Sequence, residues 1–598
     1  MRRSHWLLVG DVSPISSSMT KLWRIANYDS ALVERLAIAA NVPPVVAQLL
    51  IGRGIDSPKV AQRFLDAKLT DLRDPDQLPG VPHAAEMIFA AAKAKKRIVI
   101  YGDYDADGMT ATAILMRCLR LLHANVEFYV PHRLEQGYGL NCQSLDELHS
   151  AGTDMVITVD NGIASLKEAD HTKQLGIDLV VTDHHQMASR LPEAVAIVHP
   201  QLPGYDYPFP GLCGAAVAFK LAWALCQLAS GEKRVKPAMR EFLLQATGLA
   251  AIGTVADVVP LVDENRVLVL HGLKALSATP TVGVAAMVRA NELDKKPALA
   301  SDDIGFTIAP RLNAAGRLGQ AELAVELLTT DDPQRAAELA EFVNELNLER
   351  QSLERSVLLA ARKQAKNRFN PQEDSALVLA DHGWHAGVIG IVAGKLVEQF
   401  HRPVVLISQD KLGIKPGTGS GRSVPGFDLH RAFSECSEQL VSHGGHAAAA
   451  GLRIEDRHID RFRDEFCAVA TAEISAEHRT AQIDIDAETA FASLTRQTIT
   501  QIESLAPFGC GNRRPTLCAH EVRMAAPPRT IGSGGRHLSL ELEQHGVRLR
   551  AVAFGGGDWL EDLEKASSGN IAIAFNPVLN HFRGRVSVEM HLVDWRPE

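Results

Sequence analysis

Residues 98–108 read Ile-Val-Ile-Tyr-Gly-Asp-Tyr-Asp-Ala-Asp-Gly, a short β-branched run that ends in three aspartates. Similar apolar runs occur at residues 126–130, 155–159, 179–181 and 196–198. Most of the gaps between these runs, about 16 to 30 residues, are long enough for the crossover helix that joins parallel strands. This segment therefore predicts an α/β fold class with a mainly parallel, doubly wound sheet.

Three of the predicted strands end in Asp or His side chains. Asp103, Asp105 and Asp107 follow the first strand, Asp160 follows the third, and Asp183, His184 and His185 follow the fourth. Asp257 is a further candidate because it interrupts an apolar run at residues 253–260. In an open parallel sheet, ligands bind beyond the carboxyl ends of the strands, so we expect these groups to converge in one crevice.

Each of these residues also has a simpler explanation. A single Asp after a strand is more often a turn or helix N-cap residue than a ligand. Asp103 could hold a water or cap the turn, which makes Asp105 and Asp107 the stronger candidates, and His184-His185 alone could be a surface pair. Capping does not explain all three strand ends together, so the combination favours a metal site.

The ligand types indicate which ions and which chemistry to expect. Carboxylates mixed with imidazoles suit Mn²⁺ or Mg²⁺ better than the thiolate-rich sets that favour zinc. Two such ions about 3.5 to 4 Å apart can activate a water and stabilise the leaving oxygen of a phosphodiester. The sequence therefore predicts phosphoester hydrolysis.

Composition sets wider limits on the class of protein. A chain of 598 residues with 46% hydrophobic and 22% charged residues is expected to fold into about three to five domains. The net charge of −9 excludes the strongly basic footprint of a protein that coats nucleic acid, so any nucleic-acid contact must be local.

The eight cysteines form no C-x-x-C pair, which argues against a zinc ribbon or a disulfide framework and favours the cytoplasm. No apolar run reaches membrane-spanning length, and Met19 is an alternative start.

The rest of the chain shows three further patterns of predicted secondary structure. Residues 20–90 are expected to form short helices that cap a larger domain. The Asp331-Asp332-Pro333 segment is typical of a helix start, and it predicts one long helix at 331–367 that either bridges two lobes or packs along one domain. A second α/β unit follows, with strands near 376–379 and 404–407, and after residue 480 short strands predict a small barrel such as an OB-fold, or else a sandwich.

The run Asp183-His184-His185 resembles the signature of the DHH phosphoesterase superfamily. Segments 310–318, 419–423, 444–451 and 507–512 resemble its RecJ exonuclease branch, and the resemblance extends from about residue 50 to the end. Cys510 departs from the pattern, because an acidic residue is common at that place in the Pro-Phe-Gly-x-Gly-Asn motif.

The resemblance implies a domain order and an activity. The expected parts are an N-terminal helical cap (1–70), a DHH phosphoesterase domain (71–330), a linker helix (331–370), a DHHA1 domain (371–478) and an OB-like nucleic-acid-binding domain (479–598). The implied activity is 5′ to 3′ exonucleolytic hydrolysis of single-stranded DNA in recombination and repair, with two Mn²⁺ or Mg²⁺ ions per site. The implied partners are single-stranded DNA, single-stranded-DNA-binding protein and a RecQ-type helicase.

Carried over residue by residue, the resemblance also assigns roles at the site. The implied metal ligands are Asp103, Asp105, Asp107, Asp160, His184, His185 and Asp257. The implied catalytic residues are Asp183, His185 and Arg317, with Asp183 orienting a neighbouring imidazole.

Several basic and polar side chains are candidates for holding the DNA strand. Arg311, Asn313 and Arg317 lie in a segment rich in small residues, expected to be a loop, where the guanidinium groups could fork onto phosphates or pair with the carboxylate cluster. Ser420 and Arg422 are expected in a glycine-flanked turn that could offer amides and a guanidinium to a terminal phosphate.

Other candidates have alternatives that are nearly as good. Arg133 and Tyr138 could clamp a phosphate and stack a base, or belong to a plain loop. The turn at His446 is expected to lead into a helix whose N-terminus could hold a phosphate, or into close packing by small residues. Near the C-terminus, basic and aromatic residues interleave as a single-strand track would require: Arg536, Arg548, Arg550, Phe582, Arg583 and Arg585.

Two rival functions remain open at this stage. The first is a phosphoesterase of the same superfamily acting on pyrophosphate, a cyclic dinucleotide or short RNA, which would need neither the linker helix nor the barrel. The second is a non-catalytic DNA-binding or replication scaffold, which could dispense with the ligands that this sequence retains.

Overall fold

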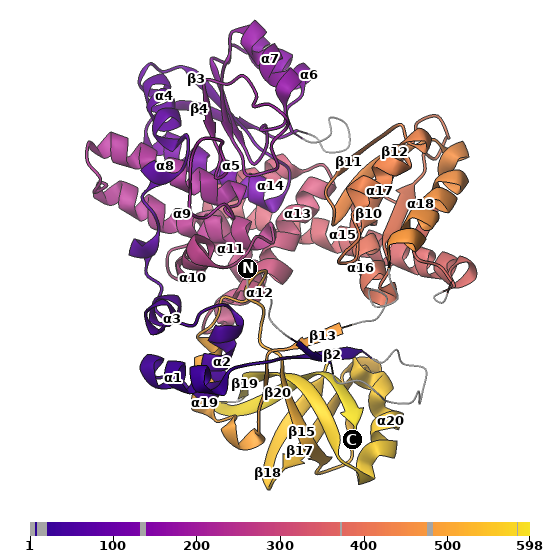
Figure 1. Cartoon of the computed structure of the whole chain (residues 1–598). Coiled ribbons are helices and arrows are strands. Elements are labelled where there is room, and N and C mark those ends of the chain that lie inside the picture. The colour runs from indigo at the N-terminus through magenta and orange to yellow at the C-terminus, as the bar shows by residue number, and fades with distance from the viewer. Residues whose placement is uncertain (1–5, 9–20, 132–138, 371–372, 475–481, 583) are drawn as a thin grey trace. The chain divides into compact units, whose positions relative to one another are not determined.

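The computed structural model describes residues 6–8, 21–131, 139–370, 373–474, 482–582 and 584–598. The chain divides into two compact units (Figure 1). Residues 72–259 and 263–481 form one, which we call the two-sheet unit, and residues 1–71, 260–262 and 482–598 form the other, which we call the barrel unit.

The first sheet of the two-sheet unit has five strands in the order β4-β3-β5-β6-β7, and all neighbouring pairs are parallel. Its strands are β3 (Arg97–Tyr101), β4 (Asn125–Tyr129), β5 (Met155–Val159), β6 (Asp178–Thr182) and β7 (Ala196–Val198). These strands lie where the apolar runs predicted them, which confirms the expected fold class. Such runs suit a parallel sheet because both of its faces are covered.

Helices cover both faces of this sheet (Figure 1). On one face, Val99 and Val156 share a core with Leu145 of α6 (Cys142–Ser150) and Ala169 of α7 (Leu166–Leu175). On the other face lie α4 (Val81–Lys93), α5 (Ala106–Leu121) and α8 (Gly214–Ser230). The remaining helices of this half are α9 (Pro237–Ala256), α10 (Asp263–Ala278), α11 (Val282–Ala290), α12 (Ser301–Asp303), a π-helix at Ile304–Ile308, α13 (Ala309–Arg317) and α14 (Ala321–Thr329).

The predicted long helix is α15 (Pro333–Arg368). It begins as expected, because the Asp332 carboxylate accepts hydrogen bonds from the backbone N–H groups of Gln334 and Arg335 and Pro333 occupies the first turn. Its first half contacts α11, α13 and α14, whereas Val357 and Ala361 pack against the second sheet. The helix therefore joins the two halves of this unit.

The second sheet has the strand order β11-β12-β10-β9-β8. Its strands are β8 (Leu377–Asp381), β9 (Val404–Ser408), β10 (Gly417–Arg422), β11 (Ser442–Gly445) and β12 (Ala449–Ile454), and its helices are α16 (Ala386–Phe400), α17 (Leu429–Glu435) and α18 (Ile459–Glu473). β8 and β9 are parallel and the other pairs are antiparallel. α16, which crosses between β8 and β9, packs on the same apolar core as those two strands.

The barrel unit closes five strands into a ring. β15 (Leu517–Met524) pairs with β17 (His537–Gln544) and β19 (Ile571–Phe582), while β18 (Val547–Ala553) pairs with β17 and, in parallel, with β20 (Arg585–Pro597). The β19–β20 pair completes the ring. One parallel pair in an otherwise antiparallel five-stranded barrel is OB-like, so the barrel expectation holds and the sandwich alternative is wrong. The smaller elements are β14 (Ala487–Glu488), β16 (Arg529–Ile531), α19 (Arg496–Glu503) and α20 (Leu560–Lys565).

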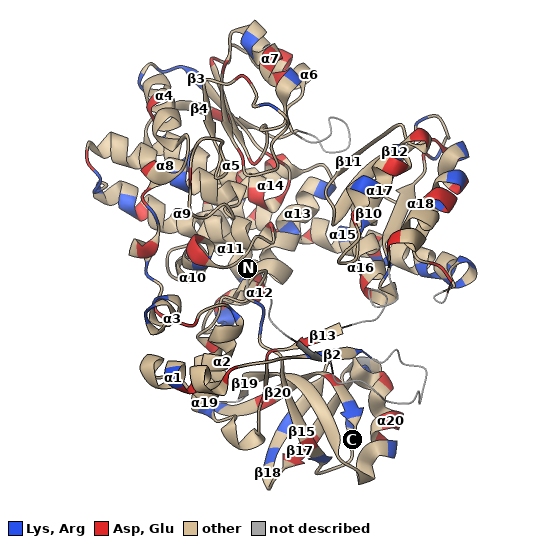
Figure 2. Ribbon diagram, viewed as in Figure 1, with Lys and Arg blue, Asp and Glu red and all other residues tan. Residues whose placement is uncertain are grey.

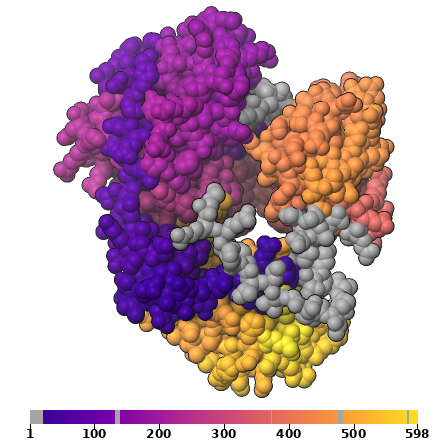
Figure 3. Space-filling view, viewed as in Figure 1, coloured from indigo at the N-terminus to yellow at the C-terminus, as the bar shows by residue number. Residues whose placement is uncertain are grey.

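The N-terminal region differs from the expected helical cap. Residues Leu22–Ala26 form a strand, β2, which pairs with β1 (Trp6–Leu8) and in parallel with β13 (Gln482–Ile485). The helices α1 (Ser30–Ala40), α2 (Pro44–Gly52) and α3 (Pro58–Leu65) share one core with the barrel, and the space-filling view shows indigo residues beside orange and yellow ones (Figure 3). Local patterns could not reveal this, because the partners lie more than 400 residues away in the chain.

Among the described residues, no single helix has both the length and the hydropathy needed to cross a membrane. Two sharply bent helix pairs, α1 with α2 and α10 with α11, reach that hydropathy only when taken together.

The shared core predicts that a mutation near the N-terminus destabilises the C-terminal barrel. Leu36→Ala, at a side chain that is 1% exposed, is expected to lower the free energy of unfolding of the barrel unit by about 2–5 kcal/mol. Hydrogen exchange of the β15 amides should accelerate accordingly. Ile38→Ala on the same helix is the control, because Ile38 is 83% exposed. Unchanged exchange in β15 of Leu36→Ala would contradict a common core.

Candidate metal centre

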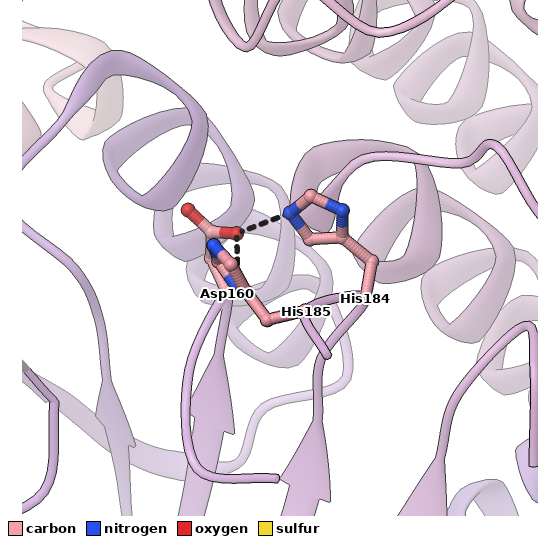
Figure 4. Close-up of side chains that lie close together, drawn as sticks. All are labelled: Asp160, His184 and His185. Atoms are coloured by element: carbon pink, nitrogen blue, oxygen red, sulfur yellow. Dashed lines mark hydrogen bonds and ion pairs between the residues drawn. The ribbon is translucent and has the colours of Figure 1, made fainter. Parts of the chain in front are cut away.

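The side chains that follow β3, β5 and β6 meet at one edge of the first sheet. Asp160 lies directly after β5, and His184 and His185 come after Asp183 in the turn that follows β6 (Figure 4). Asp257, the C-cap residue of α9, reaches the same place from outside the sheet. The structure thus brings together side chains that are spread from residue 103 to residue 257.

The Nε2 atom of His184 lies at the centre of three carboxylates. It is 3.0 Å from Asp160 Oδ1, 3.6 Å from Asp257 Oδ2 and 3.8 Å from Asp107 Oδ2. The other imidazole, His185, has its Nδ1 atom 3.9 Å from the same oxygen of Asp160 (Figure 4). Three carboxylates and two imidazoles thus converge on one place.

Three overlapping groups have ligand atoms within 4.8 Å of one another: Asp160 with His184 and His185, Asp107 with His184 and Asp257, and Asp103 with Asp105 and Asp160. Asp160 and His184 each belong to two of these groups. Such sharing is the arrangement by which carboxylates bridge two neighbouring ions. All seven sequence-predicted ligands fall into these groups.

Asp160 takes up an unusual backbone conformation. Its φ of 64° lies in the left-handed region, which Asp and Asn tolerate better than other side chains because their short polar groups bond locally. The backbone N–H of Asp160 donates to Thr182 O at 3.0 Å, which joins the ends of β5 and β6. A Cβ on Gly214 would lie 2.6 Å from Asp160 Oδ1, so the glycine leaves the space that this carboxylate fills.

Asp107 is fixed by the N-terminus of α8. Its two carboxylate oxygens accept hydrogen bonds from the backbone N–H groups of Gly214 at 2.7 Å and Ala215 at 2.9 Å. These bonds from a helix N-terminus orient the carboxylate. A Cβ on Gly253 would lie 2.4 Å from Asp107 Oδ1. Sequence reasoning missed both glycines, because nothing marks a glycine as a neighbour of a distant carboxylate.

Asp105 is the N-cap residue of α5, and its Oδ1 atom accepts from the backbone N–H groups of Asp107 and Gly108. The sequence leaves a capping role open for Asp103, whereas in the structure Asp105 is the capping residue. Asp103 is buried, and its ligand atom lies with those of Asp105 and Asp160.

Asp183 organises the turn that carries the two imidazoles. Its Oδ1 atom accepts from the backbone N–H of His184 at 2.7 Å and from Nδ1 of His185 at 2.8 Å, and its Oδ2 atom accepts from Ile163 N at 2.9 Å. A carboxylate that binds Nδ1 of a histidine fixes the ring orientation and makes Nε2 the nitrogen that faces a metal. Asp183 therefore has the geometry of a positioning residue.

The pKa values reflect crowding of negative charge. Burial, together with the charges of Asp107 and Asp105, raises the pKa of Asp257 to about 8. Burial and four neighbouring carboxylates raise the pKa of Asp160 well above its ordinary value. Burial disfavours charge on His185, but the hydrogen bond to Asp183 and its negative charge outweigh burial and raise the pKa of His185 to about 9. Without cations, the cluster therefore keeps protons that ordinary carboxyl groups lose.

This donor set fits hard divalent cations. Oxygen atoms from aspartates outnumber the imidazole nitrogens, and the three groups contain no cysteine. Such sets suit Mn²⁺ or Mg²⁺ rather than the thiolate-rich coordination of structural zinc. Positive charge would also offset the mutual repulsion that raises the carboxyl pKa values.

The predicted strand-holding residues have more varied positions. Arg311, Asn313 and Arg317 lie on helix α13, so the expected loop is wrong. Asn313 Oδ1 accepts from Ala106 N at 2.8 Å, and a Cβ on Gly316 would lie 1.8 Å from Tyr104 O, so α13 packs directly on the turn that carries Asp103–Asp107. Apolar periodicity was too weak to reveal this helix.

Arg311 and Arg317 point to different neighbours. Arg311 bonds to Asn344 of α15 and to Thr307 O. Arg317 Nη1 donates to Gly387 O at 3.0 Å, in the first turn of α16.

Ser420 and Arg422 lie on strand β10, between β9 and β12, so the expected turn is wrong and their backbone amides belong to the sheet. Their side chains reach α16, because a Cβ on Gly390 would lie 2.8 Å from Ser420 Oγ and 3.0 Å from Arg422 Nη2. Arg422 Nη1 also donates to Ser420 Oγ at 3.2 Å.

Further candidates for holding the DNA strand are His446 and three residues that the structure does not describe. His446 lies in the hairpin between β11 and β12, and its backbone N–H donates to Ala449 O, so the expected helix N-terminus is wrong. Of the alanines after it, Ala449 and Ala450 begin strand β12, which pairs with β10 and β11. Arg133 and Tyr138 lie outside the described residues, as does Arg583.

Comparisons with known proteins agree with this geometry. Three family models match: "DHH family, N-terminal domain" at residues 97–254, "DHHA1 domain" at 373–472 and "RecJ OB domain" at 485–594. The single-stranded-DNA-specific exonuclease RecJ of Bacillus subtilis is 36% identical over 573 residues, which cover 96% of this chain and 70% of that protein.

Solved structures give the same result. The crystal structure of RecJ from Thermus thermophilus in complex with Mn²⁺ matches with a TM-score of 0.80 and 31% identity, over 96% of this chain and 79% of that one. The Mg²⁺ complex matches with a TM-score of 0.75 and 30% identity, over 96% and 78%.

The shared position of Asp160 predicts that Asp160→Asn loses divalent cations without losing the fold. Asn tolerates the left-handed backbone, and removal of one repelling charge should leave the unfolding temperature of the metal-free protein unchanged or higher. Mn²⁺ affinity, measured by calorimetric titration, should fall at least about 100-fold, because even groups that only support a ligand cost 10–100-fold. The control is Asp460→Asn, at a carboxylate that is 90% exposed on α18. Normal Mn²⁺ binding by Asp160→Asn would contradict the assignment.

The raised pKa values predict how pH acts on metal binding. Asp257 must lose its proton to bind a cation, so Mn²⁺ affinity should rise with pH until about pH 8. The folded pKa exceeds the unfolded one, so this group stabilises the metal-free fold at low pH and that contribution is lost as pH rises towards 8. Scanning calorimetry should therefore show that Mn²⁺ raises the unfolding temperature more at pH 8.5 than at pH 6.5. Equal increments at both pH values would contradict a protonated cluster.

Proposed function

The chain belongs to the RecJ family of single-stranded-DNA-specific exonucleases, and we propose that it removes nucleotides from the 5′ end of single-stranded DNA by phosphodiester hydrolysis. The observation that carries this proposal is the convergence of Asp107, Asp160, His184 and Asp257 on one buried cluster. The two alternative functions explain the domains and the acidic cluster less well. A small-substrate phosphoesterase would not need the barrel, and a non-catalytic scaffold would not need the seven retained ligands.

The cofactor is Mn²⁺ or Mg²⁺, as the ligand set and the two metal complexes of the Thermus relative support. We assign its binding to Asp103, Asp105, Asp107, Asp160, His184, His185 and Asp257. When bound, a pair of such cations activates a water and stabilises the charge that develops on the phosphate oxygens.

The protein's own groups hold this arrangement ready. Asp183 fixes the His185 ring through Nδ1, so we assign Nε2 to the cation. The α8 amides hold Asp107, and the carboxylates stand in place before substrate arrives, which avoids the cost of reorganising them during the reaction. We assign Arg317 to binding of the substrate phosphate. On α13 it follows Gly316, which packs against Tyr104 in the turn that carries Asp103–Asp107.

A site for the terminal 5′-phosphate forms beside α16. Arg317, Ser420 and Arg422 approach Gly387 and Gly390, which are one turn apart at the start of this helix. A helix N-terminus attracts anions, and two guanidinium groups add charge-assisted hydrogen bonds. Since Arg317 also borders the metal-binding turn, a strand bound by its 5′ end would present its first phosphodiester to the metals. This arrangement supports 5′ to 3′ polarity.

The OB-like barrel would hold the rest of the strand. Arg548 and Arg550 on β18 are 69% and 50% exposed and pair with Glu543 and Glu589, from which a phosphate could displace them. Basic and acidic residues are mixed over these strands (Figure 2). Phe554, 61% exposed, contacts the rings of His537 and His591 and offers a surface on which a base can stack.

Two finer points rest on family resemblance and composition. The resemblance supports single-stranded-DNA-binding protein and a RecQ-type helicase as partners in recombination and repair. All eight cysteines lie within the described residues as free thiols, which supports the reducing cytoplasm as the location.

Digestion of end-labelled oligonucleotides tests this function. The protein should release labelled mononucleotides first from the 5′ end of single-stranded DNA, with Mn²⁺ or Mg²⁺ and not with a chelator. Arg422→Ala should lower the preference for a 5′-phosphate over a 5′-hydroxyl about tenfold or more, because a charge-assisted hydrogen bond contributes about 1.5–3 kcal/mol. Arg457→Ala is the matched control, since Arg457 is 73% exposed in the same domain. Digestion from the 3′ end would refute the polarity, and an unchanged preference in Arg422→Ala would refute the phosphate site.

A further inference from the structure

The chain passes from the two-sheet unit to the barrel unit and back within a few residues of a metal ligand. Asp257 ends α9 in the two-sheet unit, residues 260–262 belong to the barrel unit, and Asp263 begins α10 in the two-sheet unit again. We call residues 258–262 the strap. Only two residues separate Asp257 from the part of the strap that packs with the barrel unit.

Both ends of the strap are tightly constrained. Val258 has a φ of 59° and Asp263 a φ of 49°, in a region that is rare for a β-branched residue such as valine. Asp263 is anchored by Arg73, which donates to both of its carboxylate oxygens. The neighbouring Glu264 is fully buried and accepts from Lys220. The strap therefore cannot shift freely at its α10 end.

The middle of the strap is held by the Pro-Phe-Gly-Cys-Gly-Asn motif. Gly509 and Asn512 bond to each other through their backbones and form a tight turn, and Leu261 N donates to Cys510 O at the tip of that turn at 2.8 Å. A Cβ on Gly509 would lie 2.7 Å from Leu261, and one on Gly511 would lie 2.9 Å from Pro260. The two glycines thus make the space in which the strap lies.

The turn is itself rigidly held in the barrel unit. The Asn512 side chain is 1% exposed and donates to Leu505 O and Pro507 O, both at 2.8 Å. Arg53, at the end of α2, donates to Asn512 Oδ1 at 2.7 Å and to Arg513 O at 2.7 Å. Cys510 binds the strap through its backbone carbonyl, and the residue is exposed. The identity of its side chain therefore matters little, which explains how a cysteine can replace the acidic residue that is common at this position.

We propose that the Gly509–Asn512 turn is a positioning element for the metal centre: by holding residues 260–262 it fixes the strap and, through it, the placement of Asp257. The proposal rests on the proposed function, in which Asp257 is a metal ligand. It assigns to the barrel unit a role in metal binding in addition to contact with DNA. The glycines and Leu261 act through Asp257 and touch no reacting group.

Mn²⁺ binding in the absence of DNA tests the proposal. Gly511→Ala imposes a side chain both at a φ of 69° and against Pro260, and Leu261→Ala removes the apolar anchor of the strap. Each variant of the full-length protein should bind at least one Mn²⁺ ion about tenfold more weakly, measured from the free-Mn²⁺ signal in electron paramagnetic resonance. Affinity for single-stranded DNA in a chelator should stay within twofold of the parent protein. Saturating Mn²⁺ should restore the cleavage rate.

Gly546→Ala is the matched control, because Gly546 has a φ of 83° in the same unit but no neighbour within 4 Å of the added Cβ. If Gly511→Ala does not fold, the outcome for Leu261→Ala decides. Parental Mn²⁺ affinity in Leu261→Ala, or an equal loss in Gly546→Ala, would overturn the proposal. Asp257→Asn separates this result from a failure of the proposed function: undiminished Mn²⁺ binding by that variant would refute the ligand assignment itself.

Discussion

Mutual repulsion among carboxylates buried at one edge of a parallel sheet is the constraint on which this structure depends. Taking several ionised groups out of water is costly, and the cost rises as they approach one another. The fold offsets it locally: the α8 amides bind Asp107, the turn after β6 binds Asp183, and two glycines leave space for the oxygens. The remaining repulsion is what divalent cations relieve, so the crowding of carboxylates that is unfavourable by itself gives the site affinity for metal.

Much of this cluster could be predicted from the sequence because most of its side chains follow strands. Short apolar runs placed the five strands, and parallel strands bring their carboxyl ends to one edge, so residues as far apart as Asp103 and His185 were expected to meet. Asp257 was identified less directly, as a polar residue in an apolar run. The barrel and α15 were also predictable, since turns and capping residues are local signals.

The errors concern contacts between distant segments. The small residues around Arg317 predict a loop, whereas α13 is held as a helix by packing on the turn at Tyr104. The glycines that flank Ser420 predict a turn, yet they let Leu452 and Phe433 pack close to the strand. The local pattern predicts a helix at β2, because its partner, β13, lies at the other end of the chain. In each case tertiary contacts override local preference.

Coupling between hydrolysis and strand binding emerges from connectivity. α13 joins the turn that carries Asp103–Asp107 to the proposed phosphate site at α16, and the strap joins Asp257 to the barrel unit. The central claim is that the clustered aspartates and histidines hold two cations together. Anomalous diffraction from crystals soaked in Mn²⁺ tests it most directly: the account predicts two peaks about 3.5 to 4 Å apart, both within coordinating distance of Asp160. Peaks located elsewhere, or no peak beside Asp160, would contradict it.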